Sequence, residues 1–252
     1  MSSDAPKPFR APLRASEDAA AGPPIRRHVD VWCLPLVGPA SRAAELGSFL
    51  TDDEEARLDR IVSATRRERA RTAWGARRVI LARILGREPR DIVIVRHGRG
   101  APTVDASGRP LHVSLSHSEN WMLLAVSRTH RVGVDIERID PDADVVRLAR
   151  RFFPANEADE LASLPSSERH EAFFRAWTRK EAILKGVGGG VPSRLRSVPA
   201  GIGTRDEPVV MGGGVWTLCG LAVPEPYAAT LAVDGAACVV LHNTIESSAL
   251  IQ

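Results

Sequence analysis

The chain has 252 residues, of which 44% are hydrophobic, and is long enough to bury a sizeable core as one large domain or as two similar lobes. Lys and Arg number 34 against 31 Asp and Glu, and the resulting charge of +3 is too small to require a nucleic-acid partner. The three cysteines are widely spaced, which favours a reduced, cytoplasmic setting. The sequence shows no apolar signal sequence and no run of about 18 apolar residues, which argues against secretion and membrane spanning.

The N-terminal half opens with a segment of weak folding tendency. Residues 1–24 carry almost no large apolar side chain to offset the entropy of ordering, so we expect a disordered leader. Thr51 and Glu54 form a capping-box pattern that predicts the start of a helix. A second helix is expected over residues 66–85, with Gly86 as its stop. Alternation and β-branched residues predict strands at 28–36, 91–96, 111–116 and 121–127.

Six arginines crowd the helix expected over residues 66–85, away from its apolar face. A solvated arginine face is the usual fate of such a run, whereas an anion site for phosphate groups is the functional alternative. Composition alone favours the solvated face. The arginines are Arg66, Arg67, Arg69, Arg71, Arg77 and Arg78.

The C-terminal half again combines strands with helices. Residues 131–137 read RVGVDIE, and alternation places Asp135 and Glu137 side by side on one face of a strand. Partly buried like charges repel, and a divalent cation or a shared proton is the usual remedy; an acidic strand end near a turn explains this segment equally well. Helices are expected at 144–153, 154–164 and 173–185, and strands at 215–223, 227–233 and 237–241. The chain therefore predicts an α+β fold in two comparable halves.

The helix expected over residues 173–185, FFRAWTRKEAILK, places a carboxylate and an ammonium beside aromatic side chains. Glu181 and Lys185 are four residues apart in the order that favours a helix-stabilising ion pair, and the stretch alone favours that structural role. Taken with Asp135 and Glu137, however, Glu181 completes a set of three oxygen ligands. Magnesium prefers carboxylates together with substrate phosphates, so the set suits a magnesium-bound pyrophosphate. The cations available to the same site are His117, Lys180, Lys185 and the arginine helix.

Three short motifs occur in a recognisable order. VSLSHS stands at 113–118, GVDIE at 133–137 and WTRKEAILK at 177–185. In this order and at these separations they resemble the LSHS, GVDIE and WxxKEAxxK elements of 4'-phosphopantetheinyl transferases of the Sfp type. Any one motif is weak, but the ordered triple is specific, and the resemblance covers roughly residues 29–241.

The resemblance implies a fold and a reaction. The fold is α+β, with two pseudo-symmetric lobes that are each a small antiparallel sheet packed with helices, and with the site between them. The leader would span residues 1–24, the N-terminal lobe 25–128 and the C-terminal lobe 129–252. The reaction is the Mg²⁺-dependent transfer of the 4'-phosphopantetheine arm of coenzyme A to a serine of an apo acyl or peptidyl carrier protein. The products are holo carrier protein and adenosine 3',5'-bisphosphate, which implies a role in fatty acid or secondary metabolite biosynthesis.

Carried onto matching positions, the resemblance also implies roles for individual residues. The expected Mg²⁺ ligands are Asp135, Glu137 and Glu181, and the expected catalytic residues are Glu181, Lys185 and His117. Glu181 is a candidate base toward the carrier serine, and Lys185 would neutralise the pyrophosphate. The residues expected to contact coenzyme A are Arg71, Thr72, Gly100, Pro102, Ser116, His117, Lys180 and Lys185. The family's Gly-Lys-Pro element reads Gly100, Ala101, Pro102, without its lysine, and Glu157 loosely matches an acidic position that some relatives use near the metal.

Two other interpretations stay open. A catalytically inactive module that binds coenzyme A or a carrier protein would keep the motifs without turnover, although all three carboxylates and both lysines are present. A basic nucleic-acid-binding protein would use the arginine-rich helix, in which Trp74 is the one aromatic residue available for stacking. A hydrolase pair at Ser116 and His117 is rejected, because neighbours on one strand or turn seldom face each other. We expect coenzyme A and carrier proteins as partners, no nucleic acid and no membrane, and a cytoplasmic monomer.

Overall fold

The structure, a computed structural model, describes residues 28–95, 103–106, 109–188, 192–203, 208–235 and 239–244. The leader expected over residues 1–24 and the expected coenzyme A contacts Gly100 and Pro102 lie outside the described residues. Within the described part, no helix is both long and apolar enough to cross a membrane.

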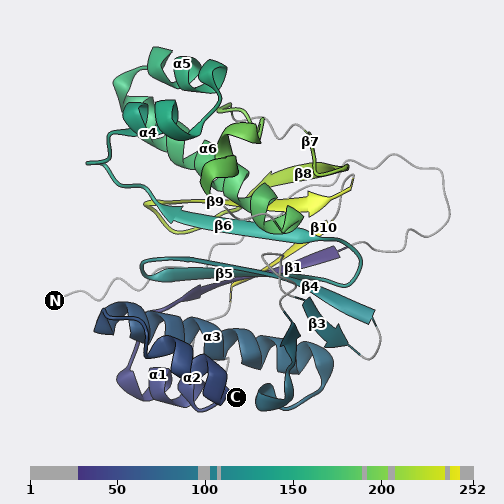
Figure 1. Ribbon diagram of the computed structural model, residues 1–252. Coiled ribbons are helices and arrows are strands. Elements are labelled where there is room, and N and C mark those ends of the chain that lie inside the picture. The colour runs from purple at the N-terminus through teal and green to yellow at the C-terminus, as the bar shows by residue number, and fades with distance from the viewer. Residues whose placement is uncertain are drawn as a thin grey trace.

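Two sheets stack face to face, and helices cover the outer face of each (Figure 1). The first sheet contains β1 (His28–Pro35), β2 (Ile94–Val95), β3 (Thr103–Ala106), β4 (Arg109–Ser118), β5 (Trp121–Ser127) and β10 (Val239–Thr244), in the order β10-β1-β5-β4-β3-β2. The second contains β6 (Val132–Arg138), β7 (Val209–Met211), β8 (Gly214–Gly220) and β9 (Tyr227–Asp234), in the order β6-β9-β8-β7. The expected α+β architecture is confirmed.

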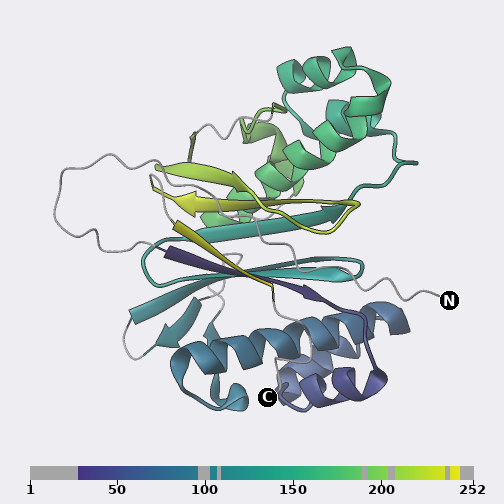
Figure 2. The ribbon, with the colours of Figure 1, turned by 180° about the vertical axis from the view of Figure 1, so that it is seen from behind.

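The helices repeat one arrangement in both halves of the molecule, as the view from behind also shows (Figure 2). On the first sheet lie α1 (Ala40–Gly47), α2 (Asp52–Leu58) and α3 (Ala64–Leu85), followed by a short 3-10 turn at Pro89–Asp91. On the second lie α4 (Val145–Phe152), α5 (Ala155–Ser163) and α6 (Ser166–Val187), followed by a 3-10 turn at Pro192–Ser197. Helices α3 and α6 each have 22 residues and each ends at a glycine in the left-handed conformation, which is Gly86 or Gly188.

Several elements differ from the sequence expectations. Helix α1 and strands β3 and β7 were not expected, and α6 begins at Ser166, seven residues before the expected start. The last strand was expected at 237–241 within the second half. It is found at β10, where it pairs in parallel with β1 of the first sheet, with His28 opposite Val239.

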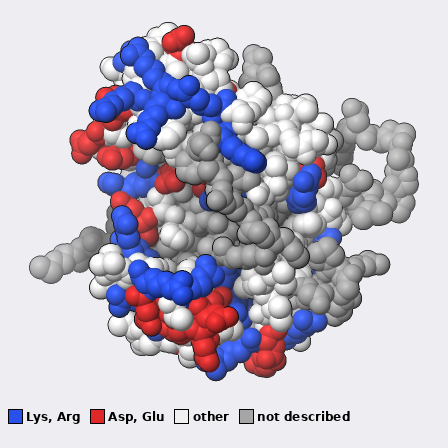
Figure 3. Space-filling view, in the orientation of Figure 1, with Lys and Arg blue, Asp and Glu red and all other residues white. Residues whose placement is uncertain are grey.

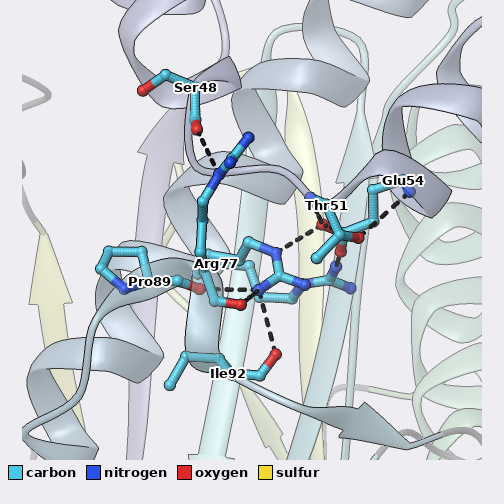
Figure 4. Close-up of polar contacts among 8 residues, drawn as sticks. Ser48, Thr51, Glu54, Arg77, Pro89 and Ile92 are labelled. Atoms are coloured by element: carbon cyan, nitrogen blue, oxygen red, sulfur yellow. Dashed lines mark hydrogen bonds and ion pairs between the residues drawn. The ribbon is translucent and has the colours of Figure 1, made fainter.

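The capping box that opens α2 extends into a buried ionic network (Figure 4). Thr51 N donates to Glu54 Oε2 at 3.2 Å, and Glu54 N donates to Thr51 Oγ1 at 3.4 Å. The Glu54 carboxylate also accepts from Arg77 Nη2 and Arg78 Nε, each at 2.6 Å, and Arg78 Nη1 reaches the carbonyl of Pro89 at 2.8 Å. Two arginines of the expected solvated face are therefore interior residues that tie α2, α3 and the following turn together.

Other arginines of α3 also have partners within the protein. Arg71 pairs with Glu55 at 3.0 Å, Arg67 Nε donates to a backbone carbonyl, and Arg69 Nη2 donates to Asn120 Oδ1 at 2.6 Å. Over this helical layer, basic side chains lie directly beside acidic ones (Figure 3). Much of the arginine run thus serves contacts inside the first half of the molecule.

The inner faces of the sheets meet through apolar side chains of β6. Val132, Val134 and Ile136 are buried in one cluster with Val29 and Leu123 of the first sheet, as the alternation predicted. The intervening residues of β6 face α6 and the site. This packing fixes where the carboxylates of the GVDIE motif can lie.

Candidate active site at the junction of the two sheets

Serine hydroxyls of β4 satisfy the free edge of β6. Among the described segments, strand β6 lies at the edge of the second sheet, so the backbone N–H groups on its outer side have no strand partner there. Three of them, at alternate positions, donate to serine hydroxyls of β4. The pairs are Val134 N to Ser114 Oγ at 3.0 Å, Ile136 N to Ser116 Oγ at 3.4 Å and Arg138 N to Ser118 Oγ at 3.1 Å. We call Ser114, Ser116 and Ser118 the serine ladder; it joins the two sheets where the VSLSHS and GVDIE motifs meet.

Ser116 is the centre of a charged cluster at this junction. Its hydroxyl donates to Asp135 Oδ1 at 2.8 Å and accepts from Lys185 Nζ at 2.8 Å. Lys185 Nζ also pairs with Asp135 Oδ1 at 2.6 Å. The structure therefore brings together Ser116 of β4, Asp135 of β6 and Lys185 of α6, which come from three separate motifs. The helix ion pair between Glu181 and Lys185, considered for the sequence alone, gives way to this contact between elements.

Two further carboxylates lie within electrostatic reach of Asp135. Burial, and then the negative charge of Asp135, raise the pKa of Glu137 to about 7. Burial and Asp135 likewise raise the pKa of Glu181. Ser118 Oγ donates to Glu137 Oε2 at 3.0 Å, and this hydrogen bond lowers the pKa of Glu137 against those two effects. Raised carboxylate pKa values indicate that the site holds more negative charge than its surroundings stabilise.

The donor set fits a divalent cation, although it is not gathered as a finished ligand cage. Among the described residues, no three His, Cys, Asp or Glu side chains form a ready metal-binding group. Asp135 Oδ2 is buried and, among those residues, has no hydrogen-bond partner. An orphaned buried carboxylate oxygen beside two acids with raised pKa values is suited to a hard cation, and oxygen ligands are what magnesium prefers.

His117 follows Ser116 on β4 but is exposed, whereas Ser116 is buried. The alternation of the strand therefore turns them to different sides, in agreement with our rejection of a hydrolase pair. Loss of solvation lowers the pKa of His117, and the charges of Lys185 and then Arg69 lower it further. The lowered pKa favours the neutral imidazole, which is within electrostatic reach of both cations.

Lys180 does not reach this cluster, and we correct the expectation that it contacts coenzyme A. Its side chain is fully buried, and Nζ pairs with Glu157 Oε2 at 2.5 Å, donates to the carbonyl of Val198 and lies over the ring of Phe153. Glu157 Oε1 accepts in turn from Gly201 N at 3.0 Å. Both residues hold α5 and α6 to the segment after the second 3-10 turn, which is a structural role.

A small cavity of about 130 Å³ lies beside α3, and only one of the two other expected contacts, Arg71 and Thr72, lines it. Thr72 lines it, whereas Arg71 is held by Glu55. The same cavity is lined by Arg42 and Arg69, whose Nε atoms, together with Nη2 of Arg42, are buried without a hydrogen-bond partner among the described residues. Two guanidinium groups with unused donors are suited to an anion.

Sequence reasoning missed three residues of this region. Arg42 lies on α1, a helix that the pattern did not predict, so no signal pointed to it. Arg69 was one member of a run. Ser118 was the last letter of a quoted motif, and the i, i+2, i+4 spacing of the three serines was the available signal.

Comparison with known proteins decides the family. Residues 131–209 match the family model described as the 4'-phosphopantetheinyl transferase superfamily. Over 211 residues the chain is 35% identical to the 4'-phosphopantetheinyl transferase HetI of Nostoc sp., an alignment that covers 82% of this chain and 88% of that protein. The chain belongs to the 4'-phosphopantetheinyl transferase superfamily. It is also 36% identical over 166 residues to the 4'-phosphopantetheinyl transferase psf-1 of Bacillus pumilus, covering 59% of this chain and 70% of that protein.

The protein is therefore an enzyme, a 4'-phosphopantetheinyl transferase, and its superfamily uses coenzyme A. The matched segment contains β6, α4, α5 and α6, which carry Asp135, Glu137, Glu181 and Lys185. The serine ladder lies just before it, on β4.

Proposed function

We propose that this phosphopantetheinyl transferase is of the Sfp type and transfers the 4'-phosphopantetheine arm of coenzyme A to a serine of an apo acyl or peptidyl carrier protein in a Mg²⁺-dependent reaction. The products are holo carrier protein and adenosine 3',5'-bisphosphate. The observation that carries the proposal is the cluster in which Lys185 and Ser116 contact Asp135 beside Glu137 and Glu181.

In the proposed site, Asp135, Glu137 and Glu181 hold Mg²⁺. When bound, the ion supplies charge neutralisation for the pyrophosphate of coenzyme A. The unpartnered Oδ2 of Asp135 and the raised pKa values of the two glutamates support this assignment.

The reaction then needs a base, an electrophile and a leaving group. Glu181 takes the proton of the carrier serine as the general base. The serine oxygen bonds to the phosphorus that carries pantetheine. The bond from that phosphorus to the bridging oxygen breaks, and adenosine 3',5'-bisphosphate leaves with the electron pair. Lys185 neutralises the charge that develops on the leaving phosphate.

The other end of coenzyme A would extend past His117 toward the cavity on α3. The lowered pKa of His117 favours its neutral form, which can donate one ring N–H to a phosphate oxygen. Arg42 and Arg69 would bind the remaining phosphate through the donors that are unused in this structure, and Thr72 lies on the same wall. In this proposal, the two arginines replace the lysine absent between Gly100 and Pro102.

The test is a transfer assay read by the mass of the carrier. The protein is incubated with Mg²⁺, coenzyme A and several apo carrier proteins, and each carrier is weighed intact. We expect a gain of one phosphopantetheine group. Glu181→Gln should abolish the gain while the thermal melt is kept, because it removes a ligand and a base but no core packing. Glu168→Gln, an exposed position on the same helix, should transfer normally.

No mass gain on any carrier would refute the transfer, and binding of coenzyme A without transfer would favour an inactive binding module. Normal turnover by Glu181→Gln would refute the assignment of Glu181. The expected cytoplasmic location, the monomeric state and the lobe boundary between residues 128 and 129 stay predictions.

A further inference from the structure

The hydroxyl of Ser118 is fixed from two sides. A serine hydroxyl has one hydrogen to donate and two lone pairs that accept. Ser118 Oγ accepts from Arg138 N at 3.1 Å, which leaves its hydrogen for Glu137 Oε2 at 3.0 Å. The backbone of β6 therefore orients the hydroxyl, and the hydroxyl orients the side chain of the neighbouring residue on β6.

The three serines of the ladder make the same backbone contact but differ in what else they touch. Ser114 accepts from Val134 N, is buried, and has no hydrogen bond to a carboxylate among the described residues. Ser116 is shared between Asp135 and Lys185, so its loss would disturb several charges at once. Ser118 has Glu137 as its side-chain partner. Ser118 and Ser114 thus form a matched pair, in which only the first reaches a proposed metal ligand.

We propose that Ser118 is a positioning residue that holds Glu137 in the orientation required for metal binding, and that Ser118 thereby links the docking of the two sheets to assembly of the site. The inference rests on the proposed function, in which Glu137 is a ligand. A glutamate has three rotatable side-chain bonds, and a single hydrogen bond to one carboxylate oxygen restricts them while the second oxygen stays available. Partners of this kind, behind the ligands themselves, commonly change metal affinity or activity 10–100-fold when they are lost.

The ladder also explains why the site lies at this junction. The N–H groups that it satisfies belong to an edge strand, which would otherwise require a neighbouring strand. Strand β4 offers serine hydroxyls in place of backbone carbonyls, and a hydroxyl that accepts one hydrogen bond can also donate another. Each of these serines can therefore donate a hydrogen bond to a side chain of β6. Two of the three serines do so, and both of their acceptors are carboxylates of the GVDIE motif.

The experiment compares Ser118→Ala, Ser118→Thr and Ser114→Ala with the wild-type chain. Mn²⁺ is the probe, and its binding is followed by loss of the free-ion electron paramagnetic resonance signal, with and without coenzyme A. The Mg²⁺ concentration for half-maximal transfer and the melting temperature are measured in parallel. We expect Ser118→Ala to weaken Mn²⁺ binding and to raise the half-saturating Mg²⁺ concentration about 10-fold. Ser118→Thr, which keeps a hydroxyl, should stay within about twofold of wild type.

Ser114→Ala should lower the melting temperature, because it leaves a buried N–H unpaired, and should leave metal binding unchanged. Equal metal affinities for Ser118→Ala and Ser114→Ala would overturn the inference, as would failure of Ser118→Thr to restore binding. If Ser118→Ala does not fold, Ser118→Cys carries the same comparison, since a thiol is a weak donor of nearly the same size. If the wild-type chain binds Mn²⁺ but modifies no carrier, the proposed transfer is refuted, while the Mn²⁺ affinities of the serine variants can still be compared. If the wild-type chain binds no Mn²⁺, the inference is overturned.

Discussion

Gly133, the first residue of the GVDIE motif, lies at a close approach of β6 to α6, and Gly133→Ala should damage the fold and the site together. A Cβ at this position would lie 1.9 Å from the carbonyl oxygen of Ala182 and 2.6 Å from the backbone nitrogen of Gly186. Ordinary contacts begin at 3.4 Å, so the helix backbone must retreat by about 1.5 Å. The obstacle is backbone on both sides, and no flexible side chain can move aside.

The cost follows from that displacement. Overpacking of a well-filled interior destabilises by about 1–3 kcal/mol, and a clash against helix backbone lies at the upper end. For a chain of this size, about 3 kcal/mol corresponds to a fall of about 6–12 °C in melting temperature. Lys185 is on the same helix, so its 2.6 Å contact with Asp135 should also lengthen, and transfer should fall in the folded fraction.

Thermal unfolding by circular dichroism measures this effect, with Gly220→Ala as the control. Gly220 is also a strand glycine, but a Cβ there would meet nothing within 4 Å, so the control should melt as wild type or slightly higher. A Gly133→Ala melt within about 2 °C of the control, with full transfer activity, would refute the close-approach argument.

Two further predictions concern the buried ion pairs. The pKa of Glu54 is lowered because, although burial raises it, the bonds and charges of Arg78 and its neighbours outweigh burial. The stabilisation this gives is therefore present above the unfolded pKa near 4.3 and is lost as the pH falls through the folded value. Glu54→Gln should lower the free energy of unfolding, measured with urea at pH 7, by about 3 kcal/mol. The difference in that free energy between the variant and wild type should decrease below about pH 4; a difference independent of pH would contradict this. Lys180→Met should cost about 3–5 kcal/mol by leaving the buried Glu157 carboxylate unpaired, and the double variant with Glu157→Gln should recover part of that loss; additive costs in the double-mutant cycle would contradict the pairing.

The sequence predicts most of the regular elements of this fold because their patterns are local. The capping box at Thr51, the stop at Gly86 and the alternation over 131–137 depend on neighbouring residues, and the structure confirms all three. Helix α1 was missed because its sequence, ASRAAELG, has Leu46 as its one large apolar residue, and it is held by packing on α3. The N-terminal extension of α6 begins with polar residues, whose helical state depends on the preceding helices.

The site could be predicted in part because short motifs mark some of its residues, whereas the contacts between elements decide the rest. The motifs identify Ser116, Asp135 and Lys185, and the structure brings these three into direct contact. Spacing cannot tell which of two neighbouring lysines turns inward, and Lys180 proved to be an interior partner of Glu157. Arg42, with N–H groups that can donate hydrogen bonds to an anion, is placed at the cavity by the packing of two helices, which no single stretch of sequence encodes.

The parallel pairing of β10 with β1 has a consequence for how the chain acquires its structure during synthesis. Strand β1 is among the first described segments to leave the ribosome, yet its neighbour at Val239–Thr244 is among the last. Until then, one edge of β1 has no partner, and exposed strand edges favour intermolecular association. Completion of the first sheet is thus a late event in translation, and truncations that remove residues 239–244 should expose nascent or isolated chains to aggregation even though every motif of the site is present.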